Sequence, residues 1–268
     1  FIFNNDNLKM RENGGITDDR YITDPLEMAE GKKQYASTDI PTLFNKVWNH
    51  NTSYHTFLTH RYNLGFYKER EDSVTTDSVQ IVQDFVPVTS FIHTLELDLN
   101  GRKYITQDDS QNRDFFEHTY FGNDSIDKNR RTSIRNTFGI SLREGFNKWA
   151  KAGLTAFLTH EYRDFTLPDS TNIPGERVIK HYKENVVYVG GELLKQQGNL
   201  LHYKVLGEFA VAGEDAGQFR VEGNGDLNLN ILGDSVRLDV NAYVKNLNPV
   251  FYYRNFHSKH YWWDNSDL

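Results

Sequence analysis

The amino-acid sequence predicts an all-β protein, an antiparallel up-and-down transmembrane β-barrel with about nine or ten strands in this chain. Three observations lead to this prediction. Apolar and polar residues alternate over unusually long segments, the connections between those segments alternate in length, and aromatic residues make up 14 % of a chain that has no long apolar run. Because a helix that crosses a bilayer needs about 18 or more apolar residues, no transmembrane helix is expected.

The clearest alternation lies on either side of a predicted tight turn at residues 233–234. Because successive side chains of a strand point to opposite faces, each half predicts a strand with one apolar and one polar face, and the two form an antiparallel hairpin. The apolar set, which we expect to face lipid, comprises Phe219, Val221, Leu227, Leu229, Ile231, Val236, Leu238 and Val240. The polar set, which we expect to face a water-filled lumen, comprises Arg220, Glu222, Asn224, Asp226, Asn228, Asn230, Arg237, Asp239 and Asn241.

Alternation by itself fits a soluble sandwich as well as a membrane barrel, and the length of the hairpin favours the barrel. At about 3.3 Å per residue, Phe219–Ile231 would extend roughly 43 Å. Ordinary strands have about 5–6 residues, whereas a strand that crosses a bilayer obliquely needs about 9–11. A soluble, Tyr-rich β protein such as a lectin is the alternative that composition leaves open.

The barrel is expected to follow an irregular N-terminal segment. Residues 1–51, which are rich in Asp, Asn, Lys and Gly, show no sustained period and are predicted to be an irregular or loop segment, whereas residues 52–268 are predicted to form the strands of one barrel domain. The chain shows no secretory signal at its start and no strand-like ending. Both ends are therefore expected to be cut, and the strands to be part of a larger barrel.

Each further strand is predicted from its own alternation. In residues 91–104, for example, Phe91 and Leu95 alternate with Thr94 and Glu96. No segment shows a sustained helical period. The predicted strands are residues 52–68, 78–86, 91–104, 131–143, 149–165, 182–195, 200–212, 219–231 and 236–245, with a tenth candidate at 250–262.

The connections between these strands fall into two classes by length, as they do in bacterial barrels with long outer loops and short periplasmic turns. A soluble sandwich has no reason to sort its loops in this way. The long class comprises residues 69–77, 105–130 and 166–181, with 213–217 as its one short member. The short class comprises residues 87–90, 144–148, 196–199 and 233–234.

The sequence indicates no catalytic residue, metal site or cofactor. The chain has no Cys, and the closest pair of its ten histidines, His257 and His260, would face opposite sides of a strand. The Gly223-Asn224-Gly225 stretch lacks the third glycine and the helix of a nucleotide-binding fingerprint. A net charge of −7 without a basic block argues against a nucleic-acid partner. An enzyme is not expected.

Two stretches of the chain carry a family resemblance. Residues 141–154 (SLREGFNKWAKAGL) and 248–255 (NPVFYYRN), the latter together with Trp262-Trp263-Asp264-Asn265, resemble the outer-membrane porins of Bacteroides-type bacteria. Shorter stretches at 63–67 and 91–95 are similar to the same family. The likeness extends from about Thr52 to the end of the chain. It implies an outer-membrane barrel of a Gram-negative bacterium with a porin role, but its motifs carry no ligand-contact residue.

Three functions are compatible with the sequence. The first is a passive channel for small hydrophilic solutes that contacts outer-membrane lipid, alone or as a homo-oligomer. The second is a structural barrel subunit of an envelope protein complex with a plugged lumen, and the third is a soluble carbohydrate-binding β protein. For a channel, the nearly balanced charge of the polar faces predicts weak ion selectivity.

Overall fold

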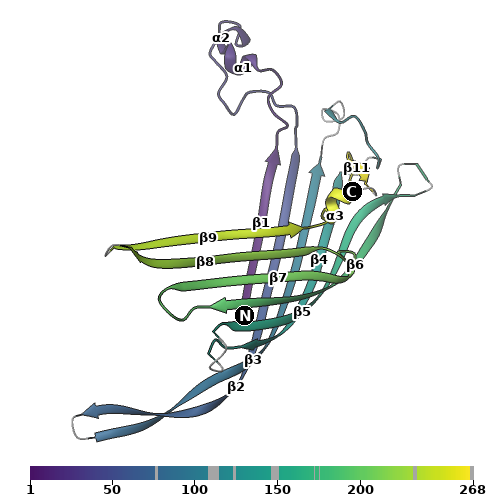
Figure 1. Cartoon of the computed structure of the whole chain (residues 1–268). Helices are drawn as coiled ribbons and strands as arrows, with labels where there is room; N and C mark the ends of the chain where they lie inside the picture. Colours follow the sequence, from purple (N-terminus) through teal and green to yellow (C-terminus); the bar gives the residue numbers. More distant parts are fainter. Residues whose placement is uncertain are drawn as a thin grey trace.

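The chain folds into one large antiparallel β-sheet (Figure 1). The computed structural model describes residues 1–75, 78–107, 115–122, 125–145, 151–171, 173–174, 176–231 and 234–265, with the side chains of 70–75, 78–81 and 231 left out. Within these residues, nine strands pair in sequence order, each with the next. The strands are β1 Ile2–Glu12, β2 Val47–Thr75, β3 Ser78–Thr106, β4 Ile126–Leu142, β5 Gly153–Ser170, β6 Arg177–Lys195, β7 Leu201–Gly213, β8 Phe219–Ile231 and β9 Asp234–Asn246. The predicted all-β, antiparallel, up-and-down fold is confirmed.

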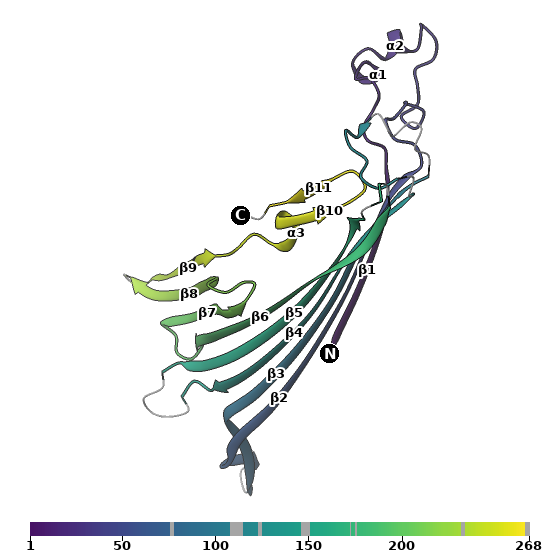
Figure 2. The ribbon, with the colours of Figure 1, turned by 90° about the vertical axis from the view of Figure 1, so that its right-hand side faces the viewer.

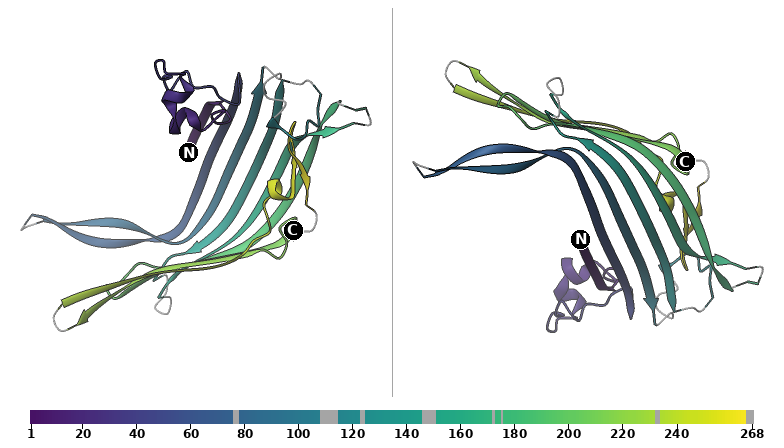
Figure 3. Two further views of the ribbon diagram at one scale, coloured as in Figure 1. Left: turned by 90° about the horizontal axis from the view of Figure 1, so that it is seen from above. Right: turned by 90° about the horizontal axis from the view of Figure 1, so that it is seen from below.

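The sheet is strongly curved, and β7–β9 run across the direction of β1–β5 in Figure 1. Seen from above or below, it forms an open curve, with β1 and β9 as its two edges (Figure 3). A short C-terminal segment lies on the concave side (Figure 2). The sheet therefore has a concave face that the chain itself partly covers and a convex face on the other side.

β2 and β3 form the longest hairpin, and this corrects two sequence-based predictions. Segments 78–86 and 91–104 were expected to be separate strands around a turn at 87–90, but both belong to β3. Pro87, which suggested the turn, pairs opposite Gly65 at a register irregularity between β2 and β3, where a side chain on Gly65 would overlap the Val86 backbone. A proline without an N–H fits a strand at such a bulge.

The corrected hairpin also changes the sorting of the connections. Because β3 replaces two predicted strands, the connection predicted at residues 69–77 moves to the other end of the sheet. It was expected among the long loops, but β2 and β3 meet at the end that carries the short turns. Residues 76–77 are outside the described residues. Residues 166–181 do not form a long loop, because β5 continues to Ser170 and β6 begins at Arg177. Parts of the turns at 144–148 and 233–234, and the start of the strand predicted at 149, lie outside the described residues.

The N-terminal segment is more ordered than its composition indicates. Residues 2–12, within the predicted irregular segment, form β1, which pairs with β2 from Ile2 opposite Phe57 to Glu12 opposite Val47. Short helical turns follow as α1, Arg20–Thr23, and α2, Pro25–Met28. Backbone pairing with β2 places β1 in the sheet although its sequence does not alternate.

The C-terminal segment does not add a tenth strand to the sheet, so the candidate strand at 250–262 is wrong. It forms α3, Phe251–Arg254, and a separate two-stranded sheet of β10, Asn255–His257, and β11, Trp262–Asp264. Phe251 packs in a buried cluster with Phe165 and Leu167 of β5. Among the described residues, no helix has the length and apolar content that crossing a membrane requires.

Candidate functional site

The strand pairing places the predicted polar residues together on the concave face. Arg220 lies opposite Lys245, Asp226 opposite Asp239, and Asn224 opposite Asn241. Arg220 also forms an ion pair with Glu208 of β7. The assignment of this face to a water-filled lumen stays a prediction.

The predicted apolar residues share the opposite, convex face. Val236, Leu238 and Val240 of β9 are each about half exposed, because no element of the described chain covers them. Leu227 and Leu229 of β8 lie opposite Leu238 and Val236 on this face. The side chain of Ile231 is outside the described residues. The assignment of this face to lipid also stays a prediction.

Arg163 of β5 is the centre of the charged network on the concave face. Its guanidinium donates to Glu161 over 2.8 and 3.2 Å and to Glu184 of β6 over 3.4 Å. The same group donates to the Tyr188 hydroxyl over 2.8 Å and pairs with Asp215 over 2.8 Å. One arginine thus joins two neighbouring strands and the turn between β7 and β8, and its five N–H donors suit such multiple contacts.

Asp215 enters the network from that turn. Tyr188 donates its hydroxyl proton to Asp215 over 2.5 Å. Burial opposes ionisation of the Asp215 carboxyl, but the hydrogen bonds from Arg163 and Tyr188 outweigh burial and hold its pKa below the usual value. The turn is therefore fixed against the sheet through an ionised carboxylate.

Glu208 of β7 connects two further arginines. One carboxylate oxygen accepts a hydrogen bond from Arg135 of β4 over 2.7 Å, and the other accepts one from Arg220 over 2.8 Å. Arg135 also lies 3.7 Å from Glu161, so the two parts of the network are continuous. The guanidinium of Arg135 stands 5.4 Å from the centre of the Tyr188 ring, within the range of a cation–π contact.

The C-terminal segment is attached to this network by a charge and by aromatic rings. Arg254 donates to Glu184 over 2.7 Å, while the Phe251 ring stacks on Phe165 with centroids 4.0 Å apart. Tyr182 contacts Phe251 from the side. These contacts hold α3 close to the concave face of β5 and β6.

A cavity of about 700 Å³ lies between the network and the C-terminal segment. One wall is charged and comes from β4–β9. The other wall is largely apolar and comes from the chain that leads into α3, including Leu247, Val250 and Phe251. This cavity is the strongest candidate for a site that contacts solutes, because it combines charged groups, aromatic rings and access from the concave face.

A second polar cluster lies on the same face, where it joins β7, β8 and β9. His202 of β7 contacts Asp226 over 2.9 Å, and Asn228 donates to the same carboxylate over 3.0 Å. Arg237 and Asp239 of β9 pair over 3.0 Å in an exposed position. Of the predicted polar residues of β8 and β9, Arg220 lines the cavity, whereas Asp226, Asn228, Arg237 and Asp239 belong to this second cluster.

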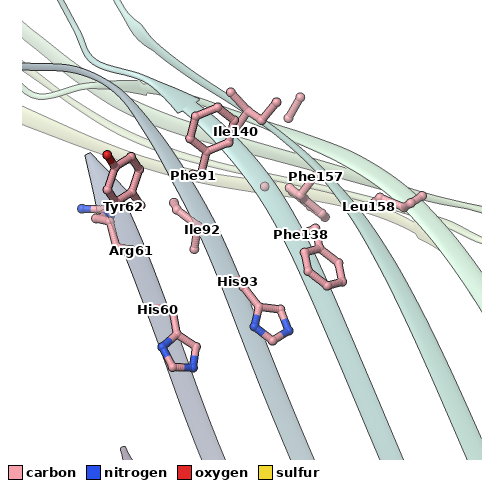
Figure 4. Close-up of a pocket in the computed structure, with 12 residues that line it drawn as sticks. His60, Arg61, Tyr62, Phe91, Ile92, His93, Phe138, Ile140, Phe157 and Leu158 are labelled. Carbon is pink, nitrogen blue, oxygen red and sulfur yellow. The ribbon is translucent and has the colours of Figure 1, made fainter. Parts of the chain in front are cut away.

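A shallow apolar hollow lies on the convex face (Figure 4). Figure 4 shows His60 and His93 on neighbouring strands of this hollow, with Phe138 beside His93. The His93 and Phe138 rings stack with centroids 4.5 Å apart. The hollow contains no carboxylate, and no group of three or more metal-ligating side chains occurs among the described residues.

Sequence reasoning missed the centre of the network. It placed Arg220 on the polar face but did not single out Glu161, Arg163, Glu184 or Glu208. The signal was present in β5, where Glu161 and Arg163 occupy alternate positions. Which partners lie beside them depends on the strand register, which the sequence does not reveal.

Comparison with protein families agrees with this architecture. The model of a family described as "putative porin" matches residues 1–268. No curated protein and no solved structure matches the chain. Because the family model covers the whole chain, the protein belongs to this porin family.

Proposed function

We propose that the chain forms part of the wall of an outer-membrane β-barrel channel through which small hydrophilic solutes diffuse passively. The observation that carries the proposal is the segregation of the two faces. Charged groups from β4–β9 gather on the concave face, and exposed aliphatic residues occupy the convex face of β8 and β9. A transmembrane barrel requires this arrangement, with lipid outside and water inside.

The two edges of the sheet support a closed barrel in the membrane. β1 and β9 each leave one side without a strand partner among the described residues. In hydrocarbon, unpaired backbone N–H and C=O groups cost several kcal/mol each, so spanning sheets close. The edges would pair with each other or with further strands of the same barrel.

The lengths of the connections at the two ends of the sheet indicate how the channel is oriented in the membrane. Residues 107–125 and 171–176 connect strands at one end of the sheet, and the turns after β6 and β8 lie at the other. By analogy with bacterial barrels, the first end would face outward and the second the periplasm. Protease added to intact cells should cut within 107–125 and spare 196–200, and the reverse pattern would invert the orientation.

A barrel with a plugged lumen is the second candidate, and the C-terminal segment is the observation that favours it. α3, β10 and β11 lie over the concave face, where they would narrow a lumen (Figure 2). In that case the protein would serve as a structural subunit of an envelope complex. Neither candidate uses catalytic chemistry or a cofactor.

Single-channel recording separates these two functions. The full-length protein would be extracted from the outer-membrane fraction with detergent and added to a planar bilayer in KCl. Discrete conductance steps are expected for the channel, whereas a plugged barrel would give none. Recovery of the protein in the soluble fraction without detergent would contradict both and favour a soluble carbohydrate-binding protein.

A further inference from the structure

The cavity beneath the C-terminal segment presents more positive than negative charge. Three of its lining residues are carboxylates, and each already pairs with arginine: Glu161, Glu208 and Asp215. Six of its lining residues are cationic: Arg131, Arg135, Arg163, Arg220, Lys245 and Arg254. The residues that line the cavity are therefore cationic in sum, although Arg254 and Lys245 also pair with Glu184 and Glu222, which lie outside the lining.

The cationic side chains of the lining are also more exposed than its carboxylates. The side chains of Glu161 and Glu208 are only 7 % and 8 % exposed, whereas those of Arg135, Arg220 and Lys245 are 28 %, 39 % and 37 % exposed. The carboxylates thus lie deep against the sheet, and the guanidinium and ammonium groups lie nearer to the solvent. A solute in the cavity would meet the cations first.

The arginines also retain donors for a ligand. Arg220 donates to Glu208 through one terminal nitrogen, and its side chain is still 39 % exposed. Arg131 lies 3.7 Å from Glu161, beyond hydrogen-bond distance. A guanidinium carries five N–H donors whose planar geometry matches carboxylate and phosphate oxygens.

We infer that this cavity is a binding subsite for the oxyanion group, phosphate or carboxylate, of a solute. The arginines and Lys245 would hold the oxyanion, and the apolar wall of Val250 and Phe251 would face the rest of the solute. The inference deepens the proposed channel by naming a solute class. It rests on the channel function for solute entry, but binding itself can be measured without conduction.

The site is tested by calorimetric titration of inorganic phosphate, and separately of acetate, into the detergent-solubilised full-length protein. At least one of the two should bind. Arg220→Gln and Lys245→Gln should each weaken that binding about tenfold, since each removes a charge-assisted contact. Stronger binding of phosphate would assign phosphorylated solutes, and stronger binding of acetate would assign carboxylates. Binding of neither overturns the inference.

Lys204→Gln is the matched control. Lys204 of β7 pairs with Glu192 over 3.0 Å and lies outside the cavity, whereas Lys245 pairs with Glu222 over 2.7 Å and lines it. The control should bind the anion within about twofold of the unaltered protein. An equal loss in Lys204→Gln and Lys245→Gln would overturn the inference, because it would show a general effect of net charge.

Single-channel recording keeps this inference distinct from the channel function. If the protein conducts, millimolar phosphate or acetate should reduce the chloride current, and Lys245→Gln should relieve that block while Lys204→Gln should not. Anion binding without conductance steps would refute the channel and support the site. Conductance steps without anion binding would refute the site and support the channel.

Discussion

Arg254 donates a hydrogen bond from Nη2 to Oε1 of Glu184 over 2.7 Å, across 70 residues of sequence. The carboxylate is almost fully buried, and its other oxygen accepts a longer hydrogen bond, of 3.4 Å, from Arg163. This pair is the charged attachment of the C-terminal segment to β6. The pair holds the C-terminal segment against the concave face, where residues of that segment form one wall of the cavity.

Arg254→Met should therefore lower the free energy of unfolding by roughly 1–3 kcal/mol, because it leaves a buried carboxylate short of a donor. Urea unfolding in detergent would measure the change. Arg237→Met is the control, since Arg237 and its partner Asp239 are both about 60 % exposed and an exposed pair contributes about 0–1 kcal/mol. Equal losses in the two variants would contradict the anchoring role of Arg254.

The packing of Phe251 should hold the C-terminal segment to the sheet more strongly than the Arg254–Glu184 pair does. Phe251 is buried and stacks on Phe165. Phe251→Ala should cost about 3 kcal/mol and expose the segment after residue 247 to protease, because it removes a ring from a packed cluster. Tyr253→Ala, two residues away and 68 % exposed, should change neither property. A protease pattern for Phe251→Ala that matches the unaltered protein would show that the segment is held elsewhere.

Gly190 of β6 leaves room for the Phe157 ring of β5, which lies directly opposite it. A Cβ at position 190 would overlap that ring and lie 2.6 Å from the Gly207 carbonyl oxygen. Gly190→Ala should therefore destabilise the protein by about 1–3 kcal/mol. Adding Phe157→Leu should recover part of the loss, as thermal unfolding in detergent would show. Gly223→Ala, whose nearest atom lies 3.8 Å away, is expected to be tolerated, and a larger loss there would contradict this explanation.

The two faces of β8 should differ in the reagents that reach them. A cysteine at Leu227 should react with a lipid-soluble thiol probe and not with a water-soluble one, whereas a cysteine at Asn228 should show the opposite preference. Arg in place of Leu227 should cost about 2–4 kcal/mol if the site lies near the bilayer midplane, and little at Asn228. Failure of both probes at position 227 would indicate a protein partner on the convex face.

The free energy of unfolding should depend on pH through the ionisation of Asp215. Because its pKa in the folded protein is lowered, its contribution is complete above the unfolded value of about 4 and is lost as the pH falls through the folded pKa. Between pH 7 and pH 3, the unaltered protein should therefore lose more unfolding free energy than Asp215→Asn. Urea midpoints across this range would test the prediction, and parallel curves for the two proteins would contradict it.

The sequence by itself determined the class of fold and which residues of β8 and β9 share a face. A strand places alternate side chains on opposite sides, so the pattern from Phe219 to Val240 is sufficient for that assignment. The pattern failed where backbone pairing decided the structure. β1 shows no sustained alternation, and Pro87 lies within β3, opposite Gly65 at a register irregularity.

Only the tertiary structure decided which charges lie together and which of them are buried. The sequence supports a count of arginines and carboxylates along the polar faces, and that count predicts weak ion selectivity. The strand register and the returning C-terminal segment bring Glu184 and Glu208 beside arginines of other elements, Arg254 and Arg135. Each of these contacts joins residues whose distance depends on register and chain reversal, and local periodicity contains no information about either.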